Sequence, residues 1–240
     1  MNTRFSGKVV LIAGGTGGLG KAVSRAFLEE EASVIVTYRN PAEFAALETM
    51  AQAAGTNSLE GHAVDVTDES ATGAVIDSIV AKYGRLDAMV NTVGAYAGGV
   101  KLWEMDTKVF DQMLALNLRS GLMLSRAVIP AMLKAGRGAI VNVASKAAFD
   151  HAAGNAAYAA SKAGAVAMMD SLAQELKGTG VRVNSILPDI IDTEANRKAM
   201  PGADFAKWPN PQDIARVILF LCSDEAKVIH GAALPVYGDN

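Results

Sequence analysis

Short apolar runs alternate with longer segments of mixed polarity along this chain of 240 residues. Most of the apolar runs are nearly continuous in hydrophobic residues and do not alternate with polar ones. Such runs are typical of parallel strands that are covered on both faces of a sheet. The pattern therefore predicts strands at residues 8–13, 33–38, 59–64, 86–90, 138–143, 181–187 and 232–236.

The segments between these runs have the length and the apolar period of helices. We predict helices within residues 18–30, 41–54, 68–83, 107–135 and 156–178. Strands that alternate with helices through right-handed crossovers form a doubly wound parallel sheet with helices on both faces. The predicted fold is therefore α/β, with a sheet of about seven strands.

The chain shows no Pro/Ser-rich linker, no repeat and no low-complexity tract, so we predict a single domain over residues 1–240. Residues 194–211 break the alternation late in the chain, with Pro201, Pro209, Pro211 and Trp208. In doubly wound sheets, a long excursion after the carboxyl end of a strand is where a substrate lid lies. We interpret residues 194–211 as such a lid.

A glycine-rich turn stands between the first predicted strand and the first predicted helix. Glycines let the backbone approach a pyrophosphate closely, and the start of the helix offers free N–H groups and a positive dipole end. The alternative is a tight turn without a ligand, but the position between strand and helix favours a dinucleotide site. The cofactor contacts predicted in this turn are Gly14, Thr16, Gly17, Gly18, Leu19 and Gly20.

The end of the second predicted strand carries Tyr38, Arg39 and Asn40, and no acid. An NAD site usually has a carboxylate here that holds the ribose 2′-hydroxyl. Arg39 can instead pair with a 2′-phosphate, because its planar guanidinium matches phosphate geometry. These residues favour NADP(H) over NAD(H), the alternative being that Arg39 is a solvated surface charge.

The ends of the third and fourth predicted strands add weaker signals. A carboxylate at Asp65 can accept from an adenine amino group, and Val66 can offer a backbone contact. Asn91, Thr92 and Gly94 suit a close approach by a cofactor after the fourth strand. Taken alone, each of these residues could equally serve only to form a turn. We predict them as cofactor contacts because the glycine turn independently indicates a cofactor site.

Three further residues form a constellation suited to moving a proton. Ser145 follows the predicted strand 138–143, while Tyr158 and Lys162 stand four residues apart in an alanine-rich helical segment. Side chains four residues apart lie on one face of a helix. Strand, loop and helix would therefore aim a hydroxyl, a phenol and an ammonium at one space. A Tyr/Lys pair alone usually lies on an exposed helix face without a catalytic role. The pair indicates catalysis here because a predicted cofactor turn precedes it in the chain.

Composition narrows the class of protein. A net charge of −3 gives no reason to expect nucleic acid or an anionic membrane as a partner. No apolar run approaches the ~20 residues of a membrane span, and no targeting leader precedes the first strand. The single cysteine, Cys222, lies in an apolar run and reads as a small buried residue in a reducing compartment. We expect a cytoplasmic protein without a metal site.

Taken together, these residues resemble the classical short-chain dehydrogenase/reductase family over nearly the whole chain, and the Ser-Tyr-Lys spacing is the most specific part. The resemblance implies a Rossmann-type fold and a homo-oligomer, a dimer or a tetramer, packed through the helices within 107–135 and 156–178 and by the last strand. It also implies that Asn117 completes the catalytic set and binds a water, and that Pro188, Ile191 and Thr193 belong to the segment that meets the nicotinamide.

The chain departs from the family pattern in several places. The family commonly has Thr at position 13, Asn-Ala where Thr92 and Val93 stand, and Gly where Asp189 follows Pro188. Residues 187–208 and 146–150 are similar to quinonoid dihydropteridine reductases. Those enzymes use the Tyr and the Lys without the Ser and prefer NADH, so this similarity constrains the substrate only weakly.

The predicted function is an NADP(H)-dependent oxidoreductase that transfers hydride between a nicotinamide and a small carbonyl or alcohol substrate. In this hypothesis Ser145 orients the substrate oxygen and Tyr158 transfers the proton. Lys162 lowers the pKa of Tyr158, together with the oxidised nicotinamide, and holds the ribose. The alternatives are a dihydropteridine reductase-like activity on a quinonoid pterin and a non-catalytic NADP(H)-binding sensor.

Overall fold

The computed structural model describes residues 3–56 and 58–238, so the ends of the predicted domain and residue 57 lie outside the described residues. In this part of the chain, one parallel sheet has the order β3-β2-β1-β4-β5-β6-β7. The predicted single α/β domain with a doubly wound sheet is confirmed. The strands are β1 (Val9–Ala13), β2 (Ser33–Tyr38), β3 (Leu59–Ala63), β4 (Ala88–Asn91), β5 (Gly138–Val143), β6 (Val181–Pro188) and β7 (Ala233–Val236).

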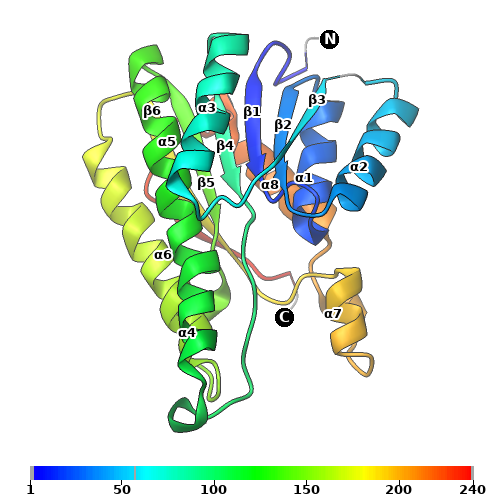
Figure 1. Cartoon of the computed structure of the whole chain (residues 1–240), viewed down its shortest axis with the longest axis vertical. Coiled ribbons are helices and arrows are strands. Elements are labelled where there is room, and N and C mark those ends of the chain that lie inside the picture. Colours follow the sequence, from blue (N-terminus) through cyan, green and yellow to red (C-terminus); the bar gives the residue numbers. More distant parts are fainter. Residues whose placement is uncertain (1–2, 57, 239–240) are drawn as a thin grey trace.

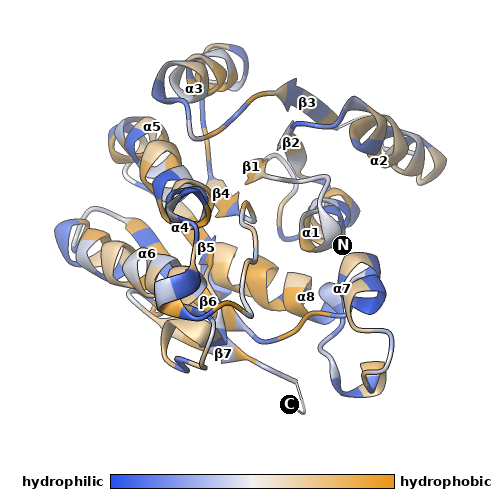
Figure 2. Ribbon diagram, turned by 60° about the horizontal axis from the view of Figure 1, so that its bottom comes forward, coloured by the Kyte–Doolittle hydropathy of each residue, from blue (hydrophilic) through white to orange (hydrophobic). Residues whose placement is uncertain are grey.

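Helices cover both faces of the sheet (Figures 1 and 2). One apolar layer packs α1, α2 and α8 on the sheet, and the other packs α3, α5 and α6. Phe27 and Ile218 are fully buried in the first layer, and Val128 is fully buried in the second. The helices are α1 (Gly18–Glu29), α2 (Pro41–Ala53), α3 (Glu69–Tyr83), α4 (Thr107–Leu114), α5 (Ser120–Ala135), α6 (Ala156–Glu175), α7 (Glu194–Ala199) and α8 (Pro211–Cys222).

The burial of the strands follows their place in the sheet. All residues of the central strand β1 are buried, in keeping with its unbroken apolar run. The edge strands β3 and β7 are only partly buried and carry Gly61 and Pro235, residues that a central strand rarely accepts. Cys222 is buried as predicted, and burial raises the pKa of its thiol to about 12.

Two helical segments differ in detail from the prediction. The predicted helix 107–135 is interrupted by a π-helical turn at Ala115–Arg119, between α4 and α5. Asn117 lies in this turn and is buried. The predicted lid 194–211 contains the short helix α7 and a 3-10 turn, Phe205–Lys207, rather than loop alone. Local polar contacts, described below, hold α7 in place.

The strand order brings the predicted site residues together at the end of the sheet where the strands have their carboxyl termini. The order reverses between β1 and β4, which pair in parallel, so the turns after both strands open at the same point. Gly14 follows β1 and Thr92 follows β4. Figure 1 shows α4 and α7 projecting beyond this same end of the sheet. None of the helices in residues 3–56 and 58–238 is both long enough and apolar enough to cross a membrane.

Candidate active site

The glycine turn is shaped by close backbone contacts that exclude side chains. A Cβ on Gly20 would lie 2.1 Å from the carbonyl oxygen of Gly14, and a Cβ on Gly18 would lie 2.8 Å from the Thr193 side chain. Gly17 is the N-cap of α1 and lacks a side-chain cap, so the first N–H groups of the helix remain directed at the turn. The turn thus presents backbone donors and a helix N-terminus to one cavity, as a pyrophosphate requires.

Thr92 ties the turn after β4 to the glycine turn after β1. Its hydroxyl donates to the carbonyl oxygen of Ala13 at 2.7 Å and lies 3.1 Å from that of Gly14. Thr37, on β2, accepts from the Gly14 N–H at 3.0 Å. These two threonines hold the turn where the family commonly has a threonine at position 13. The departures at Ala13 and Thr92 therefore lie on the two sides of one hydrogen bond.

A cavity of about 250 Å³ extends from the glycine turn over the ends of β2 and β3. Asp65 borders it, and hydrogen bonds from the backbone and the hydroxyl of Thr67 hold the pKa of this carboxyl below its usual value, with a smaller contribution from Arg39. The Asp65 carboxylate is therefore charged at neutral pH. The predicted cofactor residues that line this cavity are Gly14, Thr16, Gly17, Tyr38, Arg39, Asn40, Asp65, Val66, Thr92 and Gly94.

Arg39 is exposed at the mouth of this cavity and forms no ion pair with any residue in the described part of the chain. The Tyr38 ring beside it is stacked on Phe44 from α2, with ring centres 4.7 Å apart. A carboxylate that the sequence analysis missed, Glu43, also lines the cavity. Its only sequence signal was an acid in the first turn of a predicted helix, which is a common position for an acid.

A second cavity, of about 550 Å³, lies above the ends of β5 and β6 and contains Ser145, Tyr158 and Lys162. It shares Thr92 and Gly94 with the first cavity, so the two form one continuous surface. Gly94 packs closely against the residues behind it, because a Cβ there would lie 2.9 Å from Asn117 Oδ1 and 3.2 Å from Lys162 Nζ. Leu19, Pro188 and Ile191 also line the second cavity, as the sequence predicts.

Lys162 is 5% exposed, and its ammonium donates to the Val143 carbonyl at 2.9 Å. Burial lowers the pKa of Lys162 to about 8. Its Nζ lies 5.9 Å from the centre of the Tyr158 ring. The i and i+4 spacing therefore does place the two side chains together, on one face of α6 and against the end of β5.

We expect Lys162→Met to stabilise the fold at neutral pH while it impairs function. Below pH 8 the ammonium is charged in both the folded and the unfolded chain, so the full burial penalty, about 3 kcal/mol for the shift of its pKa, opposes folding. Loss of the bond to Val143 offsets about 1 kcal/mol. The free energy of unfolding of the variant, measured by urea titration at pH 7, should be about 2 kcal/mol higher than that of the wild type.

The pH dependence of that difference is the control. Between pH 8 and the ordinary lysine pKa of about 10.4 the unfolded chain binds more protons than the folded one, so the wild type gains stability as the pH rises. The advantage of the methionine variant should therefore disappear by about pH 10.5. A stability difference that is the same at pH 7 and pH 10.5 would contradict the buried-charge explanation.

The pKa of Tyr158 differs from the expectation. Burial raises the pKa of this phenol above its usual value, a hydrogen bond with Ser145 opposes the rise, and Tyr96 and Asp189 add to it. The expected lowering by Lys162 is thus absent from the protein by itself. The Tyr96 ring stands edge-on to the Tyr158 ring, with centres 5.0 Å apart. The phenol is a protonated donor at neutral pH.

Asn117 lies behind the cavity. Its amide group donates to the Ala95 carbonyl and to Ser161 Oγ, both at 3.0 Å, and accepts from the Ala95 N–H at 2.9 Å. The π-helical turn gives Asn117 this inward position, against the loop that follows Gly94. The geometry makes Asn117 a brace between that loop and α6, and it does not line either cavity.

Four other predicted contacts also lie outside the cavity walls. Asn91 is 1% exposed and donates to Asn142 in the neighbouring strand at 2.9 Å. Thr193 caps α7, accepting from the Asn196 N–H, while its methyl group meets Gly18. Gly18 and Gly20 do not line a cavity. The absence of a side chain at these positions lets Thr193 and the Gly14 carbonyl approach the start of α1 closely. The structure brings these residues next to the site, where they support its walls.

An ion pair that the sequence did not predict stands on the wall beside Ser145. Lys146 Nζ lies 2.7 Å from Asp189 Oδ2, and the ammonium also stands over the Tyr237 ring. Asp189 does not have a positive φ, so glycine is not required for the backbone here. The replacement of the family's usual glycine thus adds a charged pair to the cavity wall without straining the chain.

Residues of the predicted lid are held to one another by specific contacts. Arg197 forms a two-bond ion pair with Asp192, at 2.5 and 2.7 Å, and stands over the Phe205 ring. Phe205 in turn packs against the buried Trp208. Asn196 and Met200 of this segment line the second cavity. The segment is therefore an ordered wall over the cavity.

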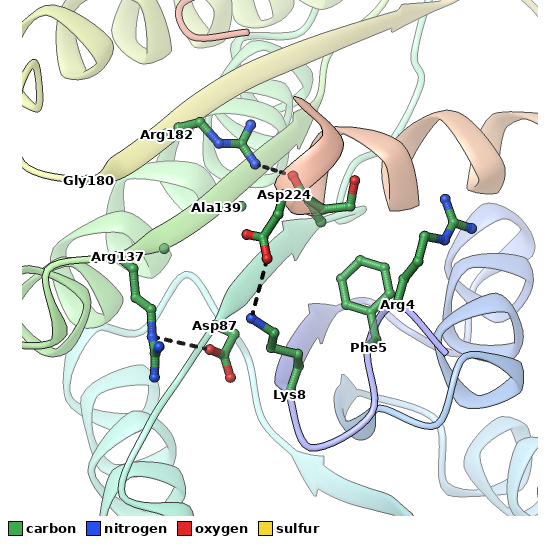
Figure 3. Close-up of a pocket in the computed structure, with 12 residues that line it drawn as sticks. Arg4, Phe5, Lys8, Asp87, Arg137, Ala139, Gly180, Arg182 and Asp224 are labelled. Carbon is green, nitrogen blue, oxygen red and sulfur yellow. Dashed lines mark hydrogen bonds and ion pairs between the residues drawn. The ribbon is translucent and has the colours of Figure 1, made fainter. Parts of the chain in front are cut away.

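A separate cavity of about 80 Å³ lies at the opposite end of the sheet, where the strands have their amino termini (Figure 3). Its charges pair with one another. Lys8 lies 3.9 Å from Asp224 and Arg137 lies 3.8 Å from Asp87, while Arg182 donates to two backbone carbonyls. These contacts join the amino ends of the strands and stand apart from the two cavities described above.

The fold and the continuous site together define a dinucleotide-binding α/β protein with a Ser-Tyr-Lys set beside the cofactor surface. The family model described as short chain dehydrogenase matches residues 8–204. This chain belongs to the short-chain dehydrogenase/reductase family, whose members are oxidoreductases.

Curated relatives match along almost their full length. The chain is 32% identical to the 3-oxoacyl-[acyl-carrier-protein] reductase FabG of Thermotoga maritima, over 98% of each protein. It is 36% identical to the D-threitol dehydrogenase of Mycolicibacterium smegmatis, over 98% of this chain and 93% of that protein.

Solved structures agree with this assignment. A short-chain type dehydrogenase/reductase from Mycobacterium ulcerans superposes with a TM-score of 0.93 at 27% identity, over 98% of this chain and 90% of that one. ElxO with NADP bound superposes with a TM-score of 0.90 at 28% identity, over 96% of this chain and 97% of that one.

Proposed function

We propose that this protein is an NADP(H)-dependent oxidoreductase that interconverts a small carbonyl compound and the matching alcohol. The observation that carries the proposal is the continuous surface from Arg39 to Tyr158, on which Thr92 and Gly94 join the two cavities. A nicotinamide dinucleotide supplies the hydride when it is bound there. The residues present fit such a cofactor, because the glycine turn and the uncapped start of α1 border the first cavity and offer backbone N–H groups to a pyrophosphate.

The chain's own residues then perform the proton chemistry. Ser145 is buried beside Tyr158 and orients the substrate oxygen by donating a hydrogen bond. Tyr158 gives its proton to that oxygen during reduction, and its raised pKa keeps it protonated at neutral pH. Lys162 supplies positive charge behind the phenol and spare N–H groups for a ribose hydroxyl, while Asn117 positions the loop after Gly94 and α6.

Cofactor choice rests on Arg39, which has no competing ion pair in the described part of the chain and is thus available to a 2′-phosphate. The NADP-bound structural relative supports the same choice. We expect Arg39→Ala to raise the Kd of NADPH about tenfold and that of NADH less than twofold, because only the former loses a charge-assisted bond. Fluorescence titration of both nucleotides measures this. Equal losses for both would refute the assignment.

A carbonyl panel with NADPH tests the function itself. The panel should contain 3-oxoacyl thioesters, small hydroxyketones, cyclic ketones and a quinonoid dihydropterin, with polyols and NADP for the reverse direction. Turnover of a carbonyl supports the proposal, and turnover confined to the pterin would favour the dihydropteridine reductase alternative. Tight NADPH binding with no turnover across the panel would instead favour a non-catalytic sensor.

The assembly and the cellular site are part of the proposal. Phe110 and Leu122 on the α4–α5 segment are exposed apolar side chains, which supports a homo-oligomer, a dimer or a tetramer, packed through α5 and α6. Light scattering of the purified protein measures the assembly. The single cysteine is free and buried, which fits a reducing cytoplasm.

A further inference from the structure

We propose that Glu43 moderates the preference of this protein for NADP(H), by opposing the binding of a 2′-phosphate at Arg39. This inference rests on the proposed function, since it concerns the same cofactor cavity. Glu43 is the third residue of α2 and lines the cavity together with Arg39, Asn40 and Thr16. Glu43 thus lies in the same cavity as Arg39, the residue that we assign to the 2′-phosphate.

The Glu43 carboxylate is held by two neutral side-chain donors, Thr16 and Asn40, that line the same cavity as Arg39. Thr16 Oγ1 donates to Glu43 Oε2 at 3.0 Å, and Asn40 Nδ2 donates to Glu43 Oε1 at 3.3 Å. Asn40 cannot turn freely, because its Oδ1 accepts from the Ala42 N–H at 3.0 Å and caps the helix. Its amide nitrogen is thereby directed at Glu43.

A hydroxyl and an amide beside a guanidinium are the donors expected of a site for a 2′-phosphate. In this structure the Glu43 carboxylate accepts from both neutral donors and so takes the place that a phosphate would occupy. A 2′-phosphate at Arg39 therefore meets a like charge, and it gains Thr16 and Asn40 only if the carboxylate moves away. A ribose 2′-hydroxyl has no such conflict, because it can donate to the carboxylate. Glu43 thus weakens NADP(H) binding and leaves room for NAD(H).

The test is a titration of the full-length protein with NADPH and NADH at fixed ionic strength. We expect Glu43→Gln to lower the Kd of NADPH about fivefold and not to lower that of NADH. Raising the salt concentration should shrink the NADPH gain, because Glu43 is exposed and its charge is screened. Glu48→Gln, on the same helix but outside the cavity wall, is the matched control and should change neither Kd.

The outcomes separate this inference from the proposed function. If Glu43→Gln matches Glu48→Gln, tightens both nucleotides equally or weakens NADPH, the inference is wrong while the NADP(H) assignment still stands on Arg39→Ala. If the wild type prefers NADH and Glu43→Gln shifts it toward NADPH, the inference holds and the predicted preference fails. If neither nucleotide binds the wild type, both are wrong.

Discussion

Replacing Tyr158 with Phe should reduce kcat for carbonyl reduction about 1,000-fold, the effect expected when a general acid is removed. The ring remains, so the edge-on contact with Tyr96 and the burial of this part of α6 should survive. The Kd of NADPH should change by less than about twofold, because the lost hydroxyl acts on the substrate oxygen. Steady-state kinetics with the best carbonyl of the panel and a fluorescence titration measure the two quantities.

The pH profile adds a second readout for Tyr158. Because burial raises the pKa of the phenol, the wild type should keep its proton donor through neutral pH and lose reductase activity only on the alkaline side of the ordinary tyrosine pKa. Alcohol oxidation needs the phenolate and should also rise with pH. This rise should fall at lower pH than the loss of reductase activity, because the oxidised nicotinamide that takes part in oxidation carries a positive charge that favours the phenolate.

Tyr83→Phe is the matched control, since it removes a phenol hydroxyl that bonds Glu60 on β3, away from both cavities. It should leave kcat unchanged. Retention of more than a tenth of the wild-type kcat by Tyr158→Phe would remove Tyr158 from the proton-transfer step.

Replacing Gly20 with Ala should disrupt both the fold and the cofactor site. The new Cβ would lie 2.1 Å from the Gly14 carbonyl oxygen and 2.9 Å from Thr92 Oγ1. These atoms belong to the backbone and to a bonded side chain, so they cannot yield without opening the turn. We expect the free energy of unfolding to fall by about 3 kcal/mol and NADPH binding to weaken more than tenfold. Urea denaturation and nucleotide titration measure the two losses.

Gly73→Ala makes the same chemical change in the interior of α3, where the new Cβ would meet no atom within 4 Å apart from its chain neighbours and the backbone of its own helix. There we expect stabilisation by about 0.5–1 kcal/mol, because alanine is the better helix former. Equal stability of the two alanine variants would show that the close contact under Gly20 does not constrain the turn.

The difference between the pKa predicted and found for Tyr158 shows where sequence reasoning ends. The i and i+4 spacing correctly placed Lys162 beside Tyr158, because helix geometry is local. The spacing could not show how deeply the phenol is buried, nor that Asp189, which follows β6, acts on it. Burial decides the direction of the pKa shift, with smaller contributions from Tyr96 and Asp189, and all three depend on how separate elements pack.

Glu43 and Asn117 illustrate the same limit from two sides. Asn117 was found through its match to a family motif, but its inward position depends on a π-helical turn that the periodicity of residues 107–135 does not reveal. Glu43 gave only the ordinary signal of an acid at the start of a helix. Its position over Thr16 exists because α2 and the glycine turn meet across the sheet edge.

The sequence by itself determined the strands, most of the helices, the doubly wound fold, the glycine turn and the Ser-Tyr-Lys set, because these depend on local apolar patterns and on short spacings. The tertiary structure alone decided which residues border the cavities, and it paired Lys146 with Asp189 and Thr16 with Glu43. The first pair is separated by 43 positions in the sequence and the second by 27. Only the packing of helices on the parallel sheet brings such distant side chains within hydrogen-bond range.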